Sequence, residues 1–164
     1  MTKATDTPVG TTKILAKWTG GHLSVSDCVD WAVNALDSGF DCPNLRILAG
    51  YPSSIAFSEV DATLRKAIAE LQIVIPDQDA LLRAYARQIA QDLIAQKIGT
   101  QECLDLIHEY VVTPLEHPVD LMQWCYLWEG NSPETFENLE GDRLAEAVHA
   151  QACQLLASDE DVSS

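Results

Sequence analysis

Apolar residues recur at intervals of three and four along most of the chain, which is the pattern of amphipathic α-helices. The first clear case lies between residues 24 and 39, where one apolar stripe is formed by Cys28, Val29, Ala32, Val33 and Leu36. Ser24 and Asp27 have the spacing of a capping box, in which two side chains accept hydrogen bonds from amides at the start of a helix. Gly39 predicts the end of this helix, because glycine readily adopts the left-handed conformation that stops helices.

The same periodicity predicts further helices at residues 44–49, 57–71, 79–98, 101–112, 119–129 and 132–157, the last with a break at Gly141. Residues 73–75 are β-branched but reach Pro76 after three positions. We therefore expect an extended linker packed on the core there, and not a sheet strand. A short apolar patch at residues 13–18 fits either a strand or a helical turn.

These elements predict an all-α fold, an irregular bundle or a stack of helical hairpins with six to seven helices and no significant sheet. The chain has 164 residues, of which 47% are apolar, enough to bury a sizeable core. We expect a flexible N-terminal tail at residues 1–12, a single helical domain at 13–157 and an acidic flexible tail at 158–164.

The formal net charge of −15 is distributed unevenly along the chain. Residues 1–99 contain 11 acidic and nine basic residues, whereas residues 100–164 contain 14 acidic residues and one basic residue, Arg143. A field of this sign repels nucleic acid and anionic membrane, and it accelerates encounter with a basic protein. Solubility is the alternative explanation for an acidic surface.

The cysteines and the absence of long apolar runs predict a cytoplasmic protein. The five cysteines are odd in number and widely spread, which is typical of free thiols and not of a disulfide framework. No apolar run approaches the roughly 18 to 20 residues that span a bilayer, and residues 1–17 lack the apolar segment of a signal peptide.

The sequence carries no phosphate loop, dinucleotide fingerprint, nucleophile elbow or zinc-protease pair. His149 and Cys153 share a helical face, but zinc requires two more ligands. His108 and His117 lie near Cys103 at spacings that match no metal pattern. Cys125 lies between Trp124 and Tyr126, which favours packing over nucleophilic catalysis. We therefore expect no catalytic residue, no metal and no cofactor.

Residues 121–128 are the most unusual segment, because apolar groups point in every direction around the predicted helix. A helix that is apolar all round is usually central to a bundle. The alternative is that Trp124, Tyr126 or Trp128 contributes an aromatic anchor to an interface, where such residues are enriched. We expect the core, with the interface as an open alternative.

Two segments resemble a pattern in small bacterial helical proteins: residues 30–39, which begin D-W-A-V and end in Gly39, and P-N-L-R-I-L-A-G at 43–50. The similarity continues through Y-A-R-Q-I-A at 85–90, Gly99, Ile107 and the acidic stretch after Trp128. No activity is established for those proteins. The resemblance thus implies one helical domain of bacterial origin and transfers no catalytic or binding residue.

Charge, size and the absence of catalytic motifs together favour an interaction protein. We expect an acidic immunity or antitoxin-like protein that binds and neutralises a basic protein partner, such as a toxin domain. The residues expected to contact that partner are Glu116, Asp120, Trp128, Glu129, Glu134 and Glu137. The alternatives are a ligand-binding protein or enzyme with a pocket between helices, and a regulatory adaptor.

Overall fold

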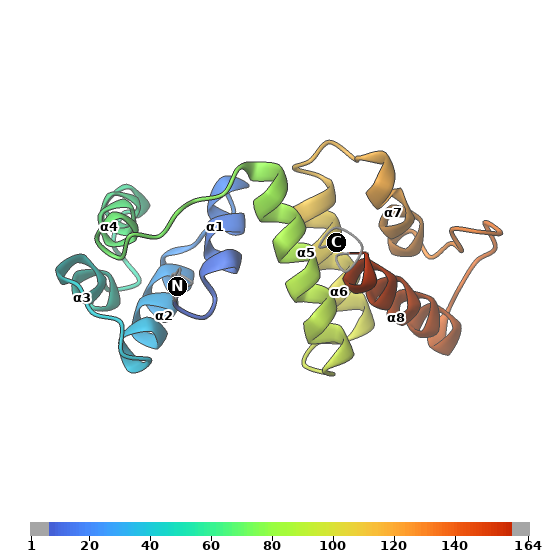
Figure 1. The fold of residues 1–164 in the computed structure, drawn as a ribbon, viewed down its shortest axis with the longest axis horizontal. Coiled ribbons are helices and arrows are strands. Elements are labelled where there is room, and N and C mark those ends of the chain that lie inside the picture. Colours follow the sequence, from blue (N-terminus) through green and yellow to red (C-terminus); the bar gives the residue numbers. More distant parts are fainter. Residues whose placement is uncertain (1–6, 159–164) are drawn as a thin grey trace, which may run out of the picture. The chain divides into compact units, whose positions relative to one another are not determined.

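The computed structural model describes residues 7–158, which form eight α-helices and no β-strand. The elements are α1 (Thr11–Thr19), α2 (Val25–Asp37), α3 (Pro43–Ala49), α4 (Phe57–Glu70), α5 (Gln78–Ile94), α6 (Thr100–Ile107), the π-helix η1 (His108–Val112), the 3₁₀-helix η2 (Val119–Leu121), α7 (Met122–Trp128) and α8 (Gly141–Ala157) (Figure 1). The all-α prediction is confirmed. The expected count of six to seven helices is too low, because the apolar patch at 13–18 lies within a helix of its own.

The helices group into two compact units, Met1–Gln78 and Asp79–Ser164. In the first unit α2 packs against α1, α3 and α4, and in the second unit α6 packs against α7 and α8. A single domain at 13–157 stays a prediction. Of the predicted tails, residues 1–6 and 159–164 lie outside the described residues, and α1 begins at Thr11, within the expected N-terminal tail.

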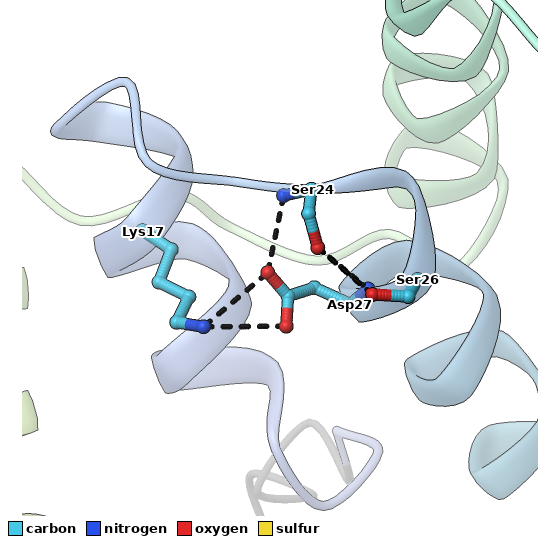
Figure 2. A network of polar contacts seen from close by, with 4 residues as sticks. All are labelled: Lys17, Ser24, Ser26 and Asp27. Carbon is cyan, nitrogen blue, oxygen red and sulfur yellow. Dashed lines mark hydrogen bonds and ion pairs between the residues drawn. The ribbon is translucent and has the colours of Figure 1, made fainter. Parts of the chain in front are cut away.

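The start of α2 is fixed by the predicted capping box and by an ion pair to α1. Asp27 accepts a hydrogen bond from the Ser24 amide at 3.0 Å, and the Asp27 amide donates to Ser24 Oγ at 3.2 Å. The ammonium of Lys17 lies 3.2 and 3.3 Å from the two carboxylate oxygens of Asp27 (Figure 2). The box satisfies amides that a helix start leaves free, and such caps contribute about 1 kcal/mol.

The buried stripe of α2 differs from the predicted one. Cys28, Trp31, Ala32 and Ala35 are buried, whereas Val33 is 40% exposed. Trp31 accounts for this difference between the predicted and the observed buried face of α2. Its indole nitrogen donates to Thr11 Oγ1 at 3.2 Å, and the Thr11 hydroxyl donates to the Pro8 carbonyl at 2.6 Å. This chain of hydrogen bonds turns Trp31 inward and fastens the start of α1 to α2.

Several helices end in a Schellman motif, in which two amides after the helix bond back to its last carbonyls. Gly39 ends α2 in this way with a φ of 97°, as predicted. Gln72 and Gln96 occupy the equivalent left-handed position after α4 and α5, with φ of 56° and 59°. The end of α5 is therefore at Ile94, four residues before the predicted end, because Gln96 reverses the chain there.

Two segments between helices depart from expectation. Residues 73–75 lie outside any helix or strand, as predicted for a linker. Only Ile73 is buried, and Val74 is 81% exposed, so the predicted packing on the core holds for one of the three residues. Residues 131–140 form a loop and not the predicted helix. The Leu139 amide donates to the Gly130 carbonyl at 2.7 Å, and Asn131 and Asn138 form an isolated β-bridge. Burial of Leu139 draws the loop back against the end of α7.

Three residues of α7, Trp124, Cys125 and Leu127, belong to the core of the second unit, in agreement with the preferred interpretation. Trp124 and Leu127 are 1% exposed, and Cys125 is 7% exposed. The elements packed against α7, namely α6, η1 and α8, contribute further buried residues, among them Leu104, Ile107, Val111, Val112 and Val148. Trp128, by contrast, is 41% exposed. Trp128, the last residue of α7, therefore lies at the surface of the second unit, where it contacts α6.

Candidate partner-binding site

Trp128 is held in a fixed position although it is exposed. Its indole nitrogen donates to Asp105 Oδ1 of α6 at 3.0 Å. One face of its ring is stacked on the imidazole of His108, with centroids 3.8 Å apart and an interplanar angle of 3°. Gln101 Nε2 donates to the same oxygen of Asp105 at 2.9 Å. Two independent contacts therefore fix the orientation of an aromatic side chain that faces solvent.

His108 reaches Trp128 from the point where α6 becomes the π-helix η1. The Thr113 amide donates to the His108 carbonyl at 3.0 Å, which is the i to i+5 bond of a π-helix. Such segments are rare and frequently occur at functional sites. A turn follows η1, and Glu116 and His117 beyond it both have a φ of 59°. Left-handed conformations are uncommon for residues other than glycine, and two in succession are costly.

The conformation of His117 places its ring beside the stacked pair. The imidazoles of His117 and His108 have centroids 6.2 Å apart at an angle of 67°. His108 thus contacts both His117 and Trp128. In the sequence, Glu116 precedes His117 and Glu129 follows Trp128. Glu116 and Glu129 are both exposed. We call the group of Asp105, His108, His117 and Trp128 the Trp128 platform.

Asp120, also expected at the site, is engaged within the chain. Arg83 of α5 lies between Asp79 and Asp120, with its Nε 2.8 Å from Asp79 Oδ2 and its Nη2 3.3 Å from Asp120 Oδ1. The Arg83 hydrogen bond lowers the pKa of Asp120 below its ordinary value. The charge of Asp120 is therefore balanced locally, and it contributes less to the outward field than the other expected acids.

Glu134 and Glu137 lie in the loop at 131–140, and neither takes part in the contacts that form the platform. This loop carries Phe136, which is 66% exposed and meets Tyr126 edge to face at 5.5 Å. Tyr126 and Trp128 are two positions apart on α7 and so point to different sides of the helix. Glu137 lies 3.8 Å from the Arg143 guanidinium, and both side chains are exposed. The expected acids are thus distributed over at least two surfaces of the second unit.

Sequence reasoning missed Asp105 and considered His108 and His117 only as metal ligands. A signal existed, because Asp105 and His108 are three positions apart and share a helical face. Their meeting with Trp128, however, depends on the packing of α6 against α7. Among residues 7–158, no group of three or more His, Cys, Asp or Glu side chains could hold a metal ion.

The cysteines are free thiols in the part of the chain that the structure describes. Burial raises the pKa of Cys28 and of Cys103 to about 12, so neither is a thiolate at neutral pH. Burial also raises the pKa of Cys125, assisted by the charge of Glu129. Cys153 is exposed, and its Sγ lies 3.7 Å from His149 Nδ1. These two side chains meet as their spacing predicts.

A cavity of about 520 Å³ lies between α1 and α2 in the first unit. Trp31 lines it together with charged side chains of both signs, including Lys13, Lys17, Asp27 and Asp30. Burial on its own would raise the pKa of Asp27, but hydrogen bonds from Ser24 and Lys17 outweigh burial and leave that pKa below its ordinary value. The cavity therefore combines an aromatic wall with fixed charges, as polar ligand sites do.

Comparisons with protein-family models, with curated proteins and with solved structures find no match for this chain. Within the described residues, none of the helices has the length and apolar character needed to cross a membrane.

Proposed function

We propose that this protein binds a basic protein partner through its second unit and neutralises it, in the manner of an immunity or antitoxin protein. The observation that carries the proposal is the Trp128 platform: an exposed, rigidly held aromatic in a unit of very acidic composition. Residues 79–164 contain 16 acidic and four basic residues. That combination supplies both long-range attraction for a basic surface and a central anchor.

The charge acts on the rate of encounter. Clustered charge of one sign can raise association rates by one to three orders of magnitude at low ionic strength, and salt screens the effect. All five acids of this unit that were expected at the site are exposed, and four of them, Glu116, Glu129, Glu134 and Glu137, are not paired with Arg83 as Asp120 is. Their exposure keeps their field directed to solvent, where it acts on an approaching partner.

Trp128 acts on the lifetime of the complex. Residues that dominate binding energy are enriched in Trp and are surrounded by groups that exclude water. An aromatic side chain fixed before binding loses little conformational entropy in the complex. The Asp105 hydrogen bond and the His108 stack supply that fixation. We expect Trp128→Ala to speed dissociation and changes at the acids to slow association.

The test is affinity capture from native lysate at low and high salt, followed by association kinetics with the captured protein. The triple variant Glu129→Lys, Glu134→Lys and Glu137→Lys should slow association at least tenfold at low salt. A matched triple in the first unit, Asp30→Lys, Asp37→Lys and Glu59→Lys, changes net charge equally.

The matched triple separates local charge from net charge. If the proposal holds, only the variant in the second unit loses most of the rapid association. Equal loss in both variants would mean that net charge alone attracts the partner. Unchanged association of the Glu129, Glu134 and Glu137 triple variant at low salt would contradict the electrostatic part of the proposal.

The cavity in the first unit supports a second candidate function, the binding of a small polar ligand. Its charged lining of both signs suits a zwitterion such as an amino acid. Thermal unfolding with a panel of free amino acids would test this, since a ligand that binds only the folded state raises the melting temperature. Asp30→Asn should remove any such stabilisation, and a flat response across the panel would discard this candidate.

A further inference from the structure

The first unit contains an arginine seated on a tryptophan and an aspartate. The Trp18 indole nitrogen donates to Asp61 Oδ1 at 2.7 Å, and Arg65 Nε donates to Asp61 Oδ2 at 3.0 Å. The Arg65 guanidinium carbon lies 4.6 Å from the centre of a Trp18 ring. The carboxylate thus joins the indole N–H to the guanidinium, while the aromatic face supports the cation. Arg65 holds this position although its side chain is 64% exposed.

The second unit repeats two members of this triad and not the third. Trp128 donates from its indole nitrogen to Asp105 Oδ1 at 3.0 Å, as Trp18 does to Asp61. Within residues 7–158, both hydrogen bonds to the Asp105 carboxylate, from Gln101 and Trp128, end on Oδ1, whereas Oδ2 of Asp61 accepts from Arg65. Four positions after Asp105 the helix carries Glu109 where the first unit has Arg65 after Asp61.

His108 covers one face of the Trp128 ring and leaves the rest of the exposed indole to solvent. The parallel stack at 3.8 Å uses a single face, and the side chain retains 41% of its accessible surface. His108 also braces the ring against rotation away from Asp105. Asp105 and Trp128 together therefore present an oriented carboxylate oxygen beside an aromatic surface.

We propose that Trp128 and Asp105 form a receptor for an arginine side chain of the basic partner. This inference rests on the proposed function and specifies the chemistry of recognition at the same site. The guanidinium of the partner donates to Asp105 Oδ2 and lies against the uncovered part of the Trp128 indole, as Arg65 lies on Asp61 and Trp18. The first unit supplies the template for this contact within the same chain.

Arginine fits this receptor better than lysine for a geometric reason. A guanidinium is planar, stacks on aromatic rings and donates along several fixed directions at once. A lysine ammonium is a compact, strongly hydrated charge that gains less from a flat surface. The negative charge of the second unit attracts arginine and lysine side chains alike. A preference for arginine over lysine therefore measures the contribution of Trp128 and Asp105 separately from that of the overall charge.

The experiment compares two peptides of equal charge, nona-arginine and nona-lysine, binding to the intact protein at low salt. The quantity measured is the ratio of the two dissociation constants for each variant. Asp105→Asn removes the carboxylate charge but keeps an oxygen for the Trp128 hydrogen bond. Asp142→Asn is the matched control, because it removes the same charge from an exposed aspartate of α8. Trp128→Leu removes the aromatic surface.

We expect Asp105→Asn and Trp128→Leu each to reduce the preference for arginine about two- to five-fold, the size that a cation–π contact contributes at an exposed site. Asp142→Asn should weaken both peptides equally and leave the ratio unchanged. Equal ratios in the Asp105→Asn and Asp142→Asn variants would overturn the receptor but leave the acidic binding surface intact. Failure of the wild-type protein to bind either peptide would instead overturn the proposed function, and the receptor with it.

Discussion

The imidazole of His108 and the indole of Trp128 lie parallel, 3.8 Å apart at their centroids, and join η1 to the end of α7. Stacked aromatic pairs contribute about 0.5 to 1.5 kcal/mol beyond the area they bury. We expect a coupling energy of that size in a double-mutant cycle of His108→Ala and Trp128→Ala, measured by urea unfolding.

The cycle has a control within the same unit. His149 is exposed on α8 and contacts Cys153, so a cycle of His149→Ala with Trp128→Ala should give a coupling energy near zero. A His108–Trp128 coupling no larger than the His149 control would mean that the stack does not hold the indole.

The capping box predicts a pH-dependent loss of stability. The folded-state pKa of Asp27 is below its ordinary value of 3.8, so its contribution is complete above that value and disappears as the pH falls through the folded-state pKa. Asp27→Asn should lower the free energy of unfolding by about 1 kcal/mol at pH 7. The deficit should shrink below pH 3.8, since the wild-type carboxyl then becomes protonated.

Asp30→Asn is the control for that experiment. Asp30 is exposed on the same helix, and surface substitutions of this kind change stability by less than about 0.5 kcal/mol. Denaturant titrations of both variants at pH 7 and at pH 3 would measure the difference. A deficit for Asp27→Asn that is as large at pH 3 as at pH 7 would contradict the role of the ionised carboxylate.

Features of the fold that depend only on residues close together in the sequence could be predicted from the sequence. The Ser24–Asp27 box, the stop at Gly39 and the start of α3, predicted at residue 44 and found at Pro43, each arise from local chemistry. The buried stripe of α2 could not be predicted correctly, because helical periodicity allowed two adjacent stripes. The choice between them depends on the hydrogen bond from Trp31 to Thr11, twenty positions away in the chain.

The candidate site shows the same division. The sequence identified Trp128 and its acidic surroundings, since composition and charge are local properties. It could not identify Asp105 as a partner of Trp128, because their contact crosses from α6 to α7. The loop at 131–140 was mistaken for a helix for a related reason: burial of Leu139 outweighs the weak helical tendency of the segment.

The left-handed residue after α5 offers a route to greater stability. Gln96 has a φ of 59°, a conformation that costs a residue with a side chain about 1 to 2 kcal/mol and costs glycine little. Because glycine also loses more backbone entropy on folding, we expect Gln96→Gly to stabilise the protein by about 0.5 to 1 kcal/mol.

Gln91→Gly, in the same helix, should lower the stability of the protein, which is the opposite of the effect expected for Gln96→Gly. Gln91 is exposed in the interior of α5, where glycine lowers helix stability by about 0.5 to 1 kcal/mol. Chemical denaturation of the two variants should therefore move the unfolding midpoint in opposite directions. Destabilisation by Gln96→Gly would mean that the glutamine side chain contributes contacts that offset its backbone strain.

Thiol labelling should distinguish Cys153 from the buried cysteines. Cys153 is exposed, whereas Cys28 and Cys103 are fully buried and have pKa values raised by burial to about 12. Thiolates are the reactive species, so both the burial and the raised pKa slow modification. With a chromogenic disulfide reagent at pH 8, we expect one thiol per chain to react rapidly and the remainder to react only as the protein unfolds.

Cys153→Ser identifies the rapid phase. This change should abolish it and leave the slow phase unaltered, because the side chain lies on the exposed face of α8. The slow phase should accelerate with denaturant in parallel with the loss of helical circular dichroism, since both then report opening of the core. Rapid modification of a second thiol in the folded variant would show that part of the core around Cys42 or Cys125, which are 8% and 7% exposed, opens without global unfolding.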